Sequence, residues 1–218
     1  MTQSDTPVLV PALDALVLAA GRGARFGGDK LLADLDGGPL ATWALRAALA
    51  APVRRVLVAV GDDPRLVAAL QAAAVRWGAS DRIDLIGVPN AAEGMGVSLR
   101  TVAAATPADV DGVFVFLGDM PAIAPETPAR LAAALRAPDQ VVVPVHAGRR
   151  GHPVLFGAAW LAALKRLEGD QGARKLLAEA GSRLVTVDVD DPGALLDVDR
   201  PEDLARLARP IGASGPDR

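Results

Sequence analysis

Hydrophobic and polar positions follow two alternating patterns along most of the chain. Alanine- and leucine-rich segments with helical periodicity predict helices at residues 39–51, 64–76, 94–105 and 125–136. Short apolar runs between them predict strands that are buried on both faces, at residues 15–19, 55–60, 83–88, 113–117 and 141–145. Such alternation is typical of βαβ units, so we expect an α/β fold with a mostly parallel central sheet.

The pattern changes after residue 145. A basic, glycine-containing turn at 147–151 precedes a short strand at 153–156, helices at 158–167 and 173–180, a strand at 183–187 and a closing helix at 201–207. We expect this part of the chain to cover the site. No repeat or linker divides the sequence, so we expect a single domain over residues 13–208, a flexible tail at 1–12 and a disordered tail at 209–218.

Composition argues against several kinds of function. The formal net charge of −3 gives no basic face for a nucleic-acid backbone. The absence of cysteine excludes disulfides, thiolate metal sites and cysteine nucleophiles. No segment approaches the roughly 18 uninterrupted apolar residues of a membrane span, and the start of the chain lacks the form of a secretory signal. We therefore expect a cytoplasmic protein with no nucleic-acid or membrane partner.

A glycine-rich, basic loop directly follows the first predicted strand. It reads Leu18-Ala-Ala-Gly-Arg-Gly-Ala-Arg-Phe-Gly-Gly-Asp-Lys30. Its glycines let backbone amides point at an anion, and Arg25 and Lys30 add cations at the sheet edge where α/β proteins bind ligands. Lys30 is the only lysine among the first 164 residues, which suggests that a compact ammonium is needed there. A triphosphate fits this loop, although a flexible loop with surface arginines is the alternative.

Two better-known phosphate loops do not match this segment. The dinucleotide fingerprint fails because Phe26 stands where the third glycine is required. A P-loop would need serine or threonine after its lysine, whereas Leu31 follows Lys30.

Two acidic segments are candidates for a metal site. Asp119 follows the predicted strand 113–117 and should reach the same sheet edge as the glycine loop, where a carboxylate suits Mg²⁺. Asp197 and Asp199 lie on one face of an extended segment, and we favour Asp199 as the second metal contact while leaving Asp197 open. The alternatives are a turn cap at Asp119 and a helix cap at Asp199 before Pro201.

Several segments resemble one enzyme family. The first loop resembles the L-A-A-G-x-x-x-R-(M/F)-G-x-x-K signature of MobA/MocA-like nucleotidyltransferases, which are related to the molybdenum-cofactor enzymes. Leu196-Asp-Val-Asp-Arg-Pro-Glu-Asp-Leu204 resembles the closing D-(I/V)-D-T-P-E-D-L motif, with Arg200 in place of threonine. The resemblance covers residues 15 to 207 and implies a Rossmann-like three-layer sandwich of the nucleotide-diphospho-sugar transferase type.

The resemblance also implies site residues. Nucleotide binding is implied for Leu18, Ala19, Ala20, Gly21, Gly23, Arg25, Lys30, Gly94, Ser98, Gly118 and Asp119. The amino end of the helix at 94–105 also suits an anion. Acceptor binding is implied for Met95, Arg100, His152 and Arg174, where His152 would donate to the acceptor. Each of these has a structural alternative. Gly94 to Arg100 would be an ordinary helix start, His152 a turn residue bonded to the backbone, and the segment before Arg174 a plain turn between helices. Arg25, Lys30 and Asp119 are the expected catalytic residues, and Asp119 and Asp199 the expected Mg²⁺ ligands.

The implied reaction is transfer of CMP from CTP to a molybdopterin-type cofactor with release of pyrophosphate. The L-A-A-G form resembles the cytidylyltransferase branch, whereas guanylyltransferases usually carry two glycines where this chain has Ala20-Gly21. A molybdenum hydroxylase or its chaperone is the implied protein partner. The alternatives are a transferase acting on a sugar or polyol phosphate and a non-catalytic molybdenum-cofactor carrier.

Overall fold

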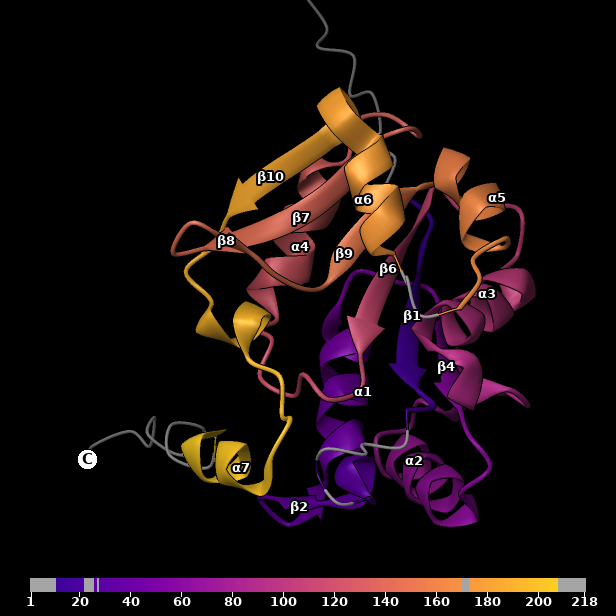
Figure 1. Ribbon diagram of the computed structural model, residues 1–218, viewed down its shortest axis with the longest axis vertical. Helices are drawn as coiled ribbons and strands as arrows, with labels where there is room; N and C mark the ends of the chain where they lie inside the picture. The colour runs from indigo at the N-terminus through magenta and orange to yellow at the C-terminus, as the bar shows by residue number, and fades with distance from the viewer. Residues whose placement is uncertain (1–10, 22–25, 27, 170–172, 208–218) are drawn as a thin grey trace, which may run out of the picture.

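One mixed sheet runs through the middle of the molecule (Figure 1). The computed structural model describes residues 11–21, 26, 28–169 and 173–207. The strands lie in the spatial order β10 (Leu184–Asp188), β7 (Val141–His146), β9 (Val154–Gly157), β6 (Gly112–Leu117), β1 (Leu13–Ala19), β4 (Val56–Val60) and β5 (Ile83–Gly87), and β8 (Arg149–Arg150) pairs with β7. Pairing is parallel between β1 and both its neighbours, between β4 and β5, and between β7 and β10. The predicted, mostly parallel sheet is confirmed.

Helices cover both faces of this sheet. Alternate β1 residues divide between two cores, with Leu13, Ala15 and Val17 in one and Leu16 in the other. The first core packs against α1 (Leu40–Ala50), α2 (Pro64–Arg76) and α4 (Glu126–Ala134). The second packs against α3 (Met95–Ala105), α5 (Leu161–Leu164) and α6 (Arg174–Ala180). These layers confirm the predicted three-layer sandwich.

A third, smaller core joins distant parts of the chain. The hairpin of β2 (Asp34–Leu35) and β3 (Gly38–Pro39) lies beside α7 (Pro201–Leu207), as Figure 1 shows. Leu35 and Leu40 pack there against Val198 and Leu207. This contact places the C-terminal acidic segment close to the loop that follows β1.

The second half of the chain also contributes strands to the central sheet. β9 lies inside the sheet and runs antiparallel to both β6 and β7. Its Leu155 and Phe156 are fully buried, because strands pack on both sides of them and helices on both faces. The helix predicted at 158–167 is shorter, with a 3₁₀ turn at Ala158–Trp160 before α5.

The predictions for the chain ends fall largely outside the described residues, since residues 1–10 and 208–218 are not among them. Within the described part of the chain, no helix combines the length and apolar character needed to cross a bilayer.

Candidate active site

The carboxyl ends of β1 and β6 meet at one edge of the sheet, and both arrowheads lie at that edge in Figure 1. The Gly118 amide donates a hydrogen bond of 2.9 Å to the carbonyl of Leu18. A Cβ on Gly118 would lie only 2.8 Å from that oxygen and 3.1 Å from the Cβ of Ala19. Glycine at 118 therefore lets the two strand ends approach and presents Asp119 beside the first loop.

The C-terminal acidic segment docks against Asp119 through its backbone. Val198 is fully buried, and its amide donates to the carbonyl of Asp119 at 3.0 Å. The carboxylate of Asp203 accepts from the backbone amides of Asp199 and Arg200 at 3.1 and 2.9 Å. Because Asp203 caps the start of α7 in this way, the side chain of Asp199 can face the site.

Lys30 lies between the two acidic segments. Its Nζ is 2.7 Å from Oδ2 of Asp119 and 3.3 Å from Oδ1 of Asp199. The Lys30 side chain is 11% exposed, whereas those of Asp119 and Asp199 are 24% and 44% exposed. Burial by itself would lower the pKa of Lys30, but hydrogen bonds and charges from both carboxylates raise it above its ordinary value. The ammonium is therefore firmly charged, and the cluster opens to solvent on the side of Asp199.

The donor set suits one particular kind of metal site. No group of three or more histidine, aspartate or glutamate side chains able to hold a metal occurs among the described residues. The carboxylates of Asp119 and Asp199 converge on the Lys30 ammonium. Such a pair fits Mg²⁺, because this ion keeps several waters and binds through one or two carboxylates plus substrate phosphates. Asp119 and Asp199 are the residues that would hold it.

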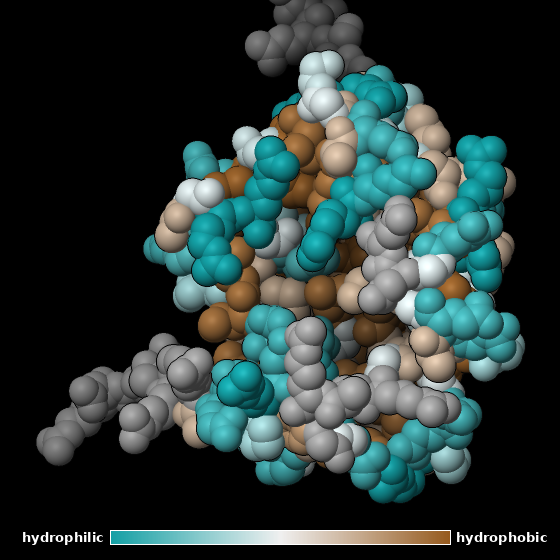
Figure 2. All heavy atoms as spheres, in the orientation of Figure 1, coloured by the Kyte–Doolittle hydropathy of each residue, from teal (hydrophilic) through white to brown (hydrophobic). Residues whose placement is uncertain are grey.

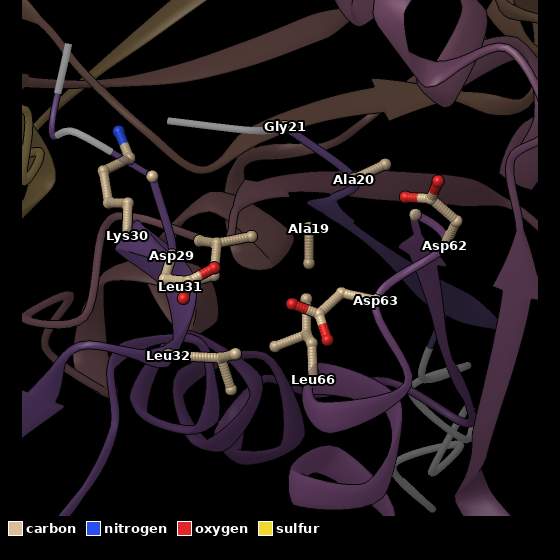
Figure 3. A pocket seen from close by; sticks show the side chains of 12 residues that line it. Ala19, Ala20, Gly21, Asp29, Lys30, Leu31, Leu32, Asp62, Asp63 and Leu66 are labelled. Atoms are coloured by element: carbon tan, nitrogen blue, oxygen red, sulfur yellow. The ribbon is translucent and has the colours of Figure 1, made fainter. Parts of the chain in front are cut away.

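A cavity of about 340 Å³ begins beside this cluster. Its walls come from the end of β1, from the first loop and from the β4–α2 loop, and Lys30 and Asp62 both line it. In Figure 3, Lys30 lies on one side of the cavity and Asp62 and Asp63 on the other. Figure 2 shows hydrophobic residues in the middle of the molecular face seen in Figure 1, with hydrophilic residues around them.

Asp63 and Arg65 fix the far wall of this cavity. Asp63 is the N-cap of α2 and accepts from the amide of Arg65 at 2.9 Å, with Pro64 at the first helical position. The guanidinium of Arg65 also donates to Asp29 at 2.7 Å, which links α2 to the first loop. This wall was not among the predicted site residues, although Gly61-Asp-Asp63 directly follows a predicted strand and could have indicated it.

His152 lies behind the acidic cluster, and its amide donates to the carbonyl of Ala194 at 2.8 Å. Burial lowers the pKa of the His152 ring, against the opposite influence of the Val115 carbonyl and of the charges on Asp119 and Asp197. Its Nδ1 atom is buried and has no hydrogen-bond partner within the described structure. Burial therefore favours the neutral form of the His152 imidazole over the charged form.

The other expected residues lie on α3 and α6. Gly94 precedes α3 with a φ of 127°, and Met95 is 46% exposed. Ser98 is buried within α3, and the guanidinium of Arg100 donates to the carbonyl of Leu167 at 3.2 Å. Arg174 is exposed at the start of α6.

The structure thus brings Lys30, Asp119 and Asp199 into direct contact. Leu18 is at the end of β1, where its carbonyl accepts the Gly118 amide, and Ala19, Ala20 and Gly21 line the cavity. The predictions for Gly23 and Arg25 lie outside the described residues.

Known proteins share this architecture over almost the whole chain. The purine catabolism protein PucB of Bacillus subtilis (strain 168) is 30% identical over 210 residues, which cover 91% of this chain and 97% of PucB. The crystal structure of Rv0371c from Mycobacterium tuberculosis H37Rv is 30% identical, with a TM-score of 0.70 and coverage of 91% of this chain and 98% of Rv0371c. Its manganese complex matches with 29% identity, a TM-score of 0.68 and the same coverage of 91% and 98%.

A nucleotidyl transferase from Methanothermobacter has the same fold, at 24% identity, a TM-score of 0.73 and coverage of 90% of this chain and 96% of that chain. The model of the MobA-like NTP transferase domain matches residues 15–185, which include the first loop, Lys30 and Asp119. With its strand order, its basic first loop and a family match over most of its length, this chain belongs to the MobA-like nucleotidyltransferases.

Proposed function

We propose that this nucleotidyltransferase transfers CMP from CTP to a molybdopterin-type cofactor and depends on Mg²⁺. The observation that carries the proposal is the contact of the Lys30 ammonium with Asp119 and Asp199 beside a cavity at the strand ends. A triphosphate needs cationic groups for its oxygens and carboxylates for its metal, and this cluster offers both. The cytidylyl assignment is supported by the Leu18-Ala-Ala-Gly21 sequence.

The reaction requires positioning more than covalent catalysis by the protein. A phosphate oxygen of the acceptor attacks the α-phosphorus of CTP, a new P–O bond forms, and the bond between the α-phosphorus and the bridging oxygen breaks to release pyrophosphate. The attacking phosphate is already ionised near neutral pH, so no strong general base is needed. Holding the two reactants in line and neutralising charge on the leaving group are then the main tasks.

Lys30 is proposed to bind the β- and γ-phosphates, where negative charge develops as pyrophosphate leaves. Arg25 is proposed to assist it. Asp119 and Asp199 would hold Mg²⁺, which supplies Lewis-acid polarisation of the phosphoryl oxygens when bound. Rv0371c has been solved with manganese, and this supports a divalent metal in the present chain.

The acceptor is proposed to bind on the opposite side of the cluster from the cavity. Met95, Arg100, His152 and Arg174 are the proposed contacts. Because burial favours the neutral form of the His152 ring, we propose that it forms a hydrogen bond with an uncharged group of the acceptor and leaves its phosphate to the arginines. A molybdenum hydroxylase is the proposed recipient of the product. PucB, a relative by sequence, is named for purine catabolism, and its name specifies neither a nucleotide nor an acceptor.

Pyrophosphate release provides the test. The purified protein is incubated with Mg²⁺, a molybdopterin acceptor and CTP, GTP or ATP in turn, and pyrophosphate is measured. We expect turnover with CTP, and a loss of about 100-fold or more in Asp119→Asn, because the charge that holds the metal is removed. Asp36→Asn is the matched control, since Asp36 is an exposed carboxylate in the β2–β3 turn and its φ of 47° suits asparagine.

Each alternative has its own outcome. Faster turnover with GTP would overturn the cytidylyl assignment. Turnover of CTP with a sugar or polyol phosphate, but not with the pterin, would replace the acceptor. Tight pterin binding without turnover of any triphosphate would indicate a cofactor carrier and refute catalysis.

A further inference from the structure

Two segments carry the acidic residues of the site, and they run past each other in opposite directions. One is the loop between β6 and α4, which contains Asp119, and the other leads from β10 to Asp199 (Figure 1). Asp191 of the second segment contacts Ala124 of the first, and further along the Val198 amide donates to the carbonyl of Asp119 at 3.0 Å. The separation of the two site carboxylates therefore depends on how these segments are fixed to each other.

Asp191 is the buried polar side chain of this contact. It is 4% exposed, and its Oδ2 accepts from the Thr127 hydroxyl at 2.7 Å and from the Ala124 amide at 3.0 Å. Asp191 precedes the 3₁₀ turn at Pro192–Leu195, but within the described structure its carboxylate does not cap that turn. The side chain crosses instead to the loop after β6 and to the first turn of α4. Breaking these bonds would leave buried polar groups unpaired, so they hold the two segments in one arrangement.

Close backbone packing supports the same contact. A Cβ on Gly193 would overlap with the carbonyl of Ala122, so glycine is needed for this approach of the two segments. The next residue, Ala194, is fully buried, and its carbonyl accepts the His152 amide at 2.8 Å. The segment is thus fixed by its backbone at Gly193 and Ala194, and Asp191 supplies a side-chain anchor to the start of α4.

We propose that Asp191 is a positioning residue for the metal site, which holds the loop of Asp119 and the segment of Asp199 at the separation that a divalent cation requires. The inference rests on the proposed function, because it assumes that these two carboxylates bind the metal. Removing an outer group that orients metal ligands typically lowers metal affinity by about 10- to 100-fold. Asp191 acts through the backbone and not by contact with a ligand, so we expect the lower end of this range.

Calorimetric titration of the folded protein with Mn²⁺, in the absence of nucleotide and acceptor, tests the proposal. Asp191→Ala removes the acceptor of both hydrogen bonds, and we expect the Mn²⁺ affinity to fall about tenfold. Asp191→Asn removes the same negative charge but keeps an acceptor oxygen, so its Mn²⁺ affinity should stay within about threefold of that of the unmodified protein. The difference between the two variants separates the hydrogen bonds from the charge.

A stability control separates positioning from a general loss of structure. Leu164 is fully buried in the second core, so Leu164→Ala should lower the free energy of unfolding through the cavity that it leaves. Its Mn²⁺ affinity should equal that of the unmodified protein at a temperature where denaturation curves show the variants to be folded. If Asp191→Ala does not fold, Thr127 provides the same test. Thr127→Val loses one of the two bonds and should bind Mn²⁺ about threefold more weakly than Thr127→Ser, which keeps the hydroxyl.

The outcomes distinguish this inference from the proposed function. Unchanged Mn²⁺ affinity in Asp191→Ala, or equal affinities in the two Thr127 variants where these replace it, would overturn the inference and leave the metal site in place. Equal losses in Asp191→Ala and Asp191→Asn would show an effect of charge, and equal losses in Asp191→Ala and Leu164→Ala an effect of stability. Either result also overturns the inference. If the unmodified protein binds no Mn²⁺, the metal site of the proposed function is refuted as well.

Discussion

Replacing Lys30 with methionine removes the ammonium group that lies between Asp119 and Asp199 while keeping a side chain of similar length. In the unmodified protein, a divalent cation at these carboxylates competes with the Lys30 contacts of 2.7 and 3.3 Å. In Lys30→Met this competition is gone. We therefore expect the variant to bind Mn²⁺ more tightly than the unmodified protein when no nucleotide is present.

The magnitude follows from the contacts that the metal must replace. The hydrogen bond to Asp119 is short and only partly exposed, so its net contribution is about 1.5–3 kcal/mol. The contact to Asp199 is longer, and that side chain is 44% exposed, so solvent screening makes its contribution small. The expected gain in Mn²⁺ affinity is therefore about 10- to 150-fold.

Titration calorimetry with Mn²⁺ at fixed pH and ionic strength measures this gain. Lys30→Arg keeps the positive charge and is the control, with an expected affinity close to that of the unmodified protein. Binding of CTP together with Mn²⁺ should weaken in Lys30→Met, because the phosphates lose their cation. An Mn²⁺ affinity in Lys30→Met equal to or below that of the unmodified protein would refute the reasoning, provided that a denaturation curve shows the variant to be folded.

Three further changes test the supporting structure. Gly118→Ala should lower the free energy of unfolding by about 1–3 kcal/mol in urea denaturation, because its Cβ would lie 2.8 Å from the Leu18 carbonyl oxygen; unchanged stability would contradict this contact. Burial lowers the pKa of His152 from its ordinary 6.5, so protonation favours the unfolded chain and stability falls as the pH drops below 6.5. His152→Gln should reduce the loss of Tm between about pH 7.5 and about pH 5.5, whereas the control His146→Gln should retain it. Thr127→Val removes a hydroxyl that donates at 2.7 Å to a buried aspartate, and a loss of about 1–3 kcal/mol in urea denaturation is expected.

Part of the site was predictable because it depends on local sequence. The first predicted strand ends at a glycine-rich loop, and the strand at 113–117 ends at Asp119. Parallel strands deliver such residues to a common sheet edge, so the approach of Lys30 and Asp119 could be expected. The wall formed by Asp62 and Asp63 was not predicted, because two acidic residues before Pro64 are also typical of an ordinary helix cap. Asp63 is in fact the N-cap of α2.

The sequence by itself determined the α/β class, the order of strands and helices, and the chemical character of the first loop, because these follow from periodicity and residue type within short windows. Only the tertiary structure decided that β9 runs antiparallel inside the sheet, since a short apolar run specifies neither its direction nor its neighbours. It also decided that Asp199, 169 positions after Lys30, shares that ammonium with Asp119. This depends on the buried contact of Val198 in the third core and on the cap provided by Asp203, which join segments that no local pattern connects.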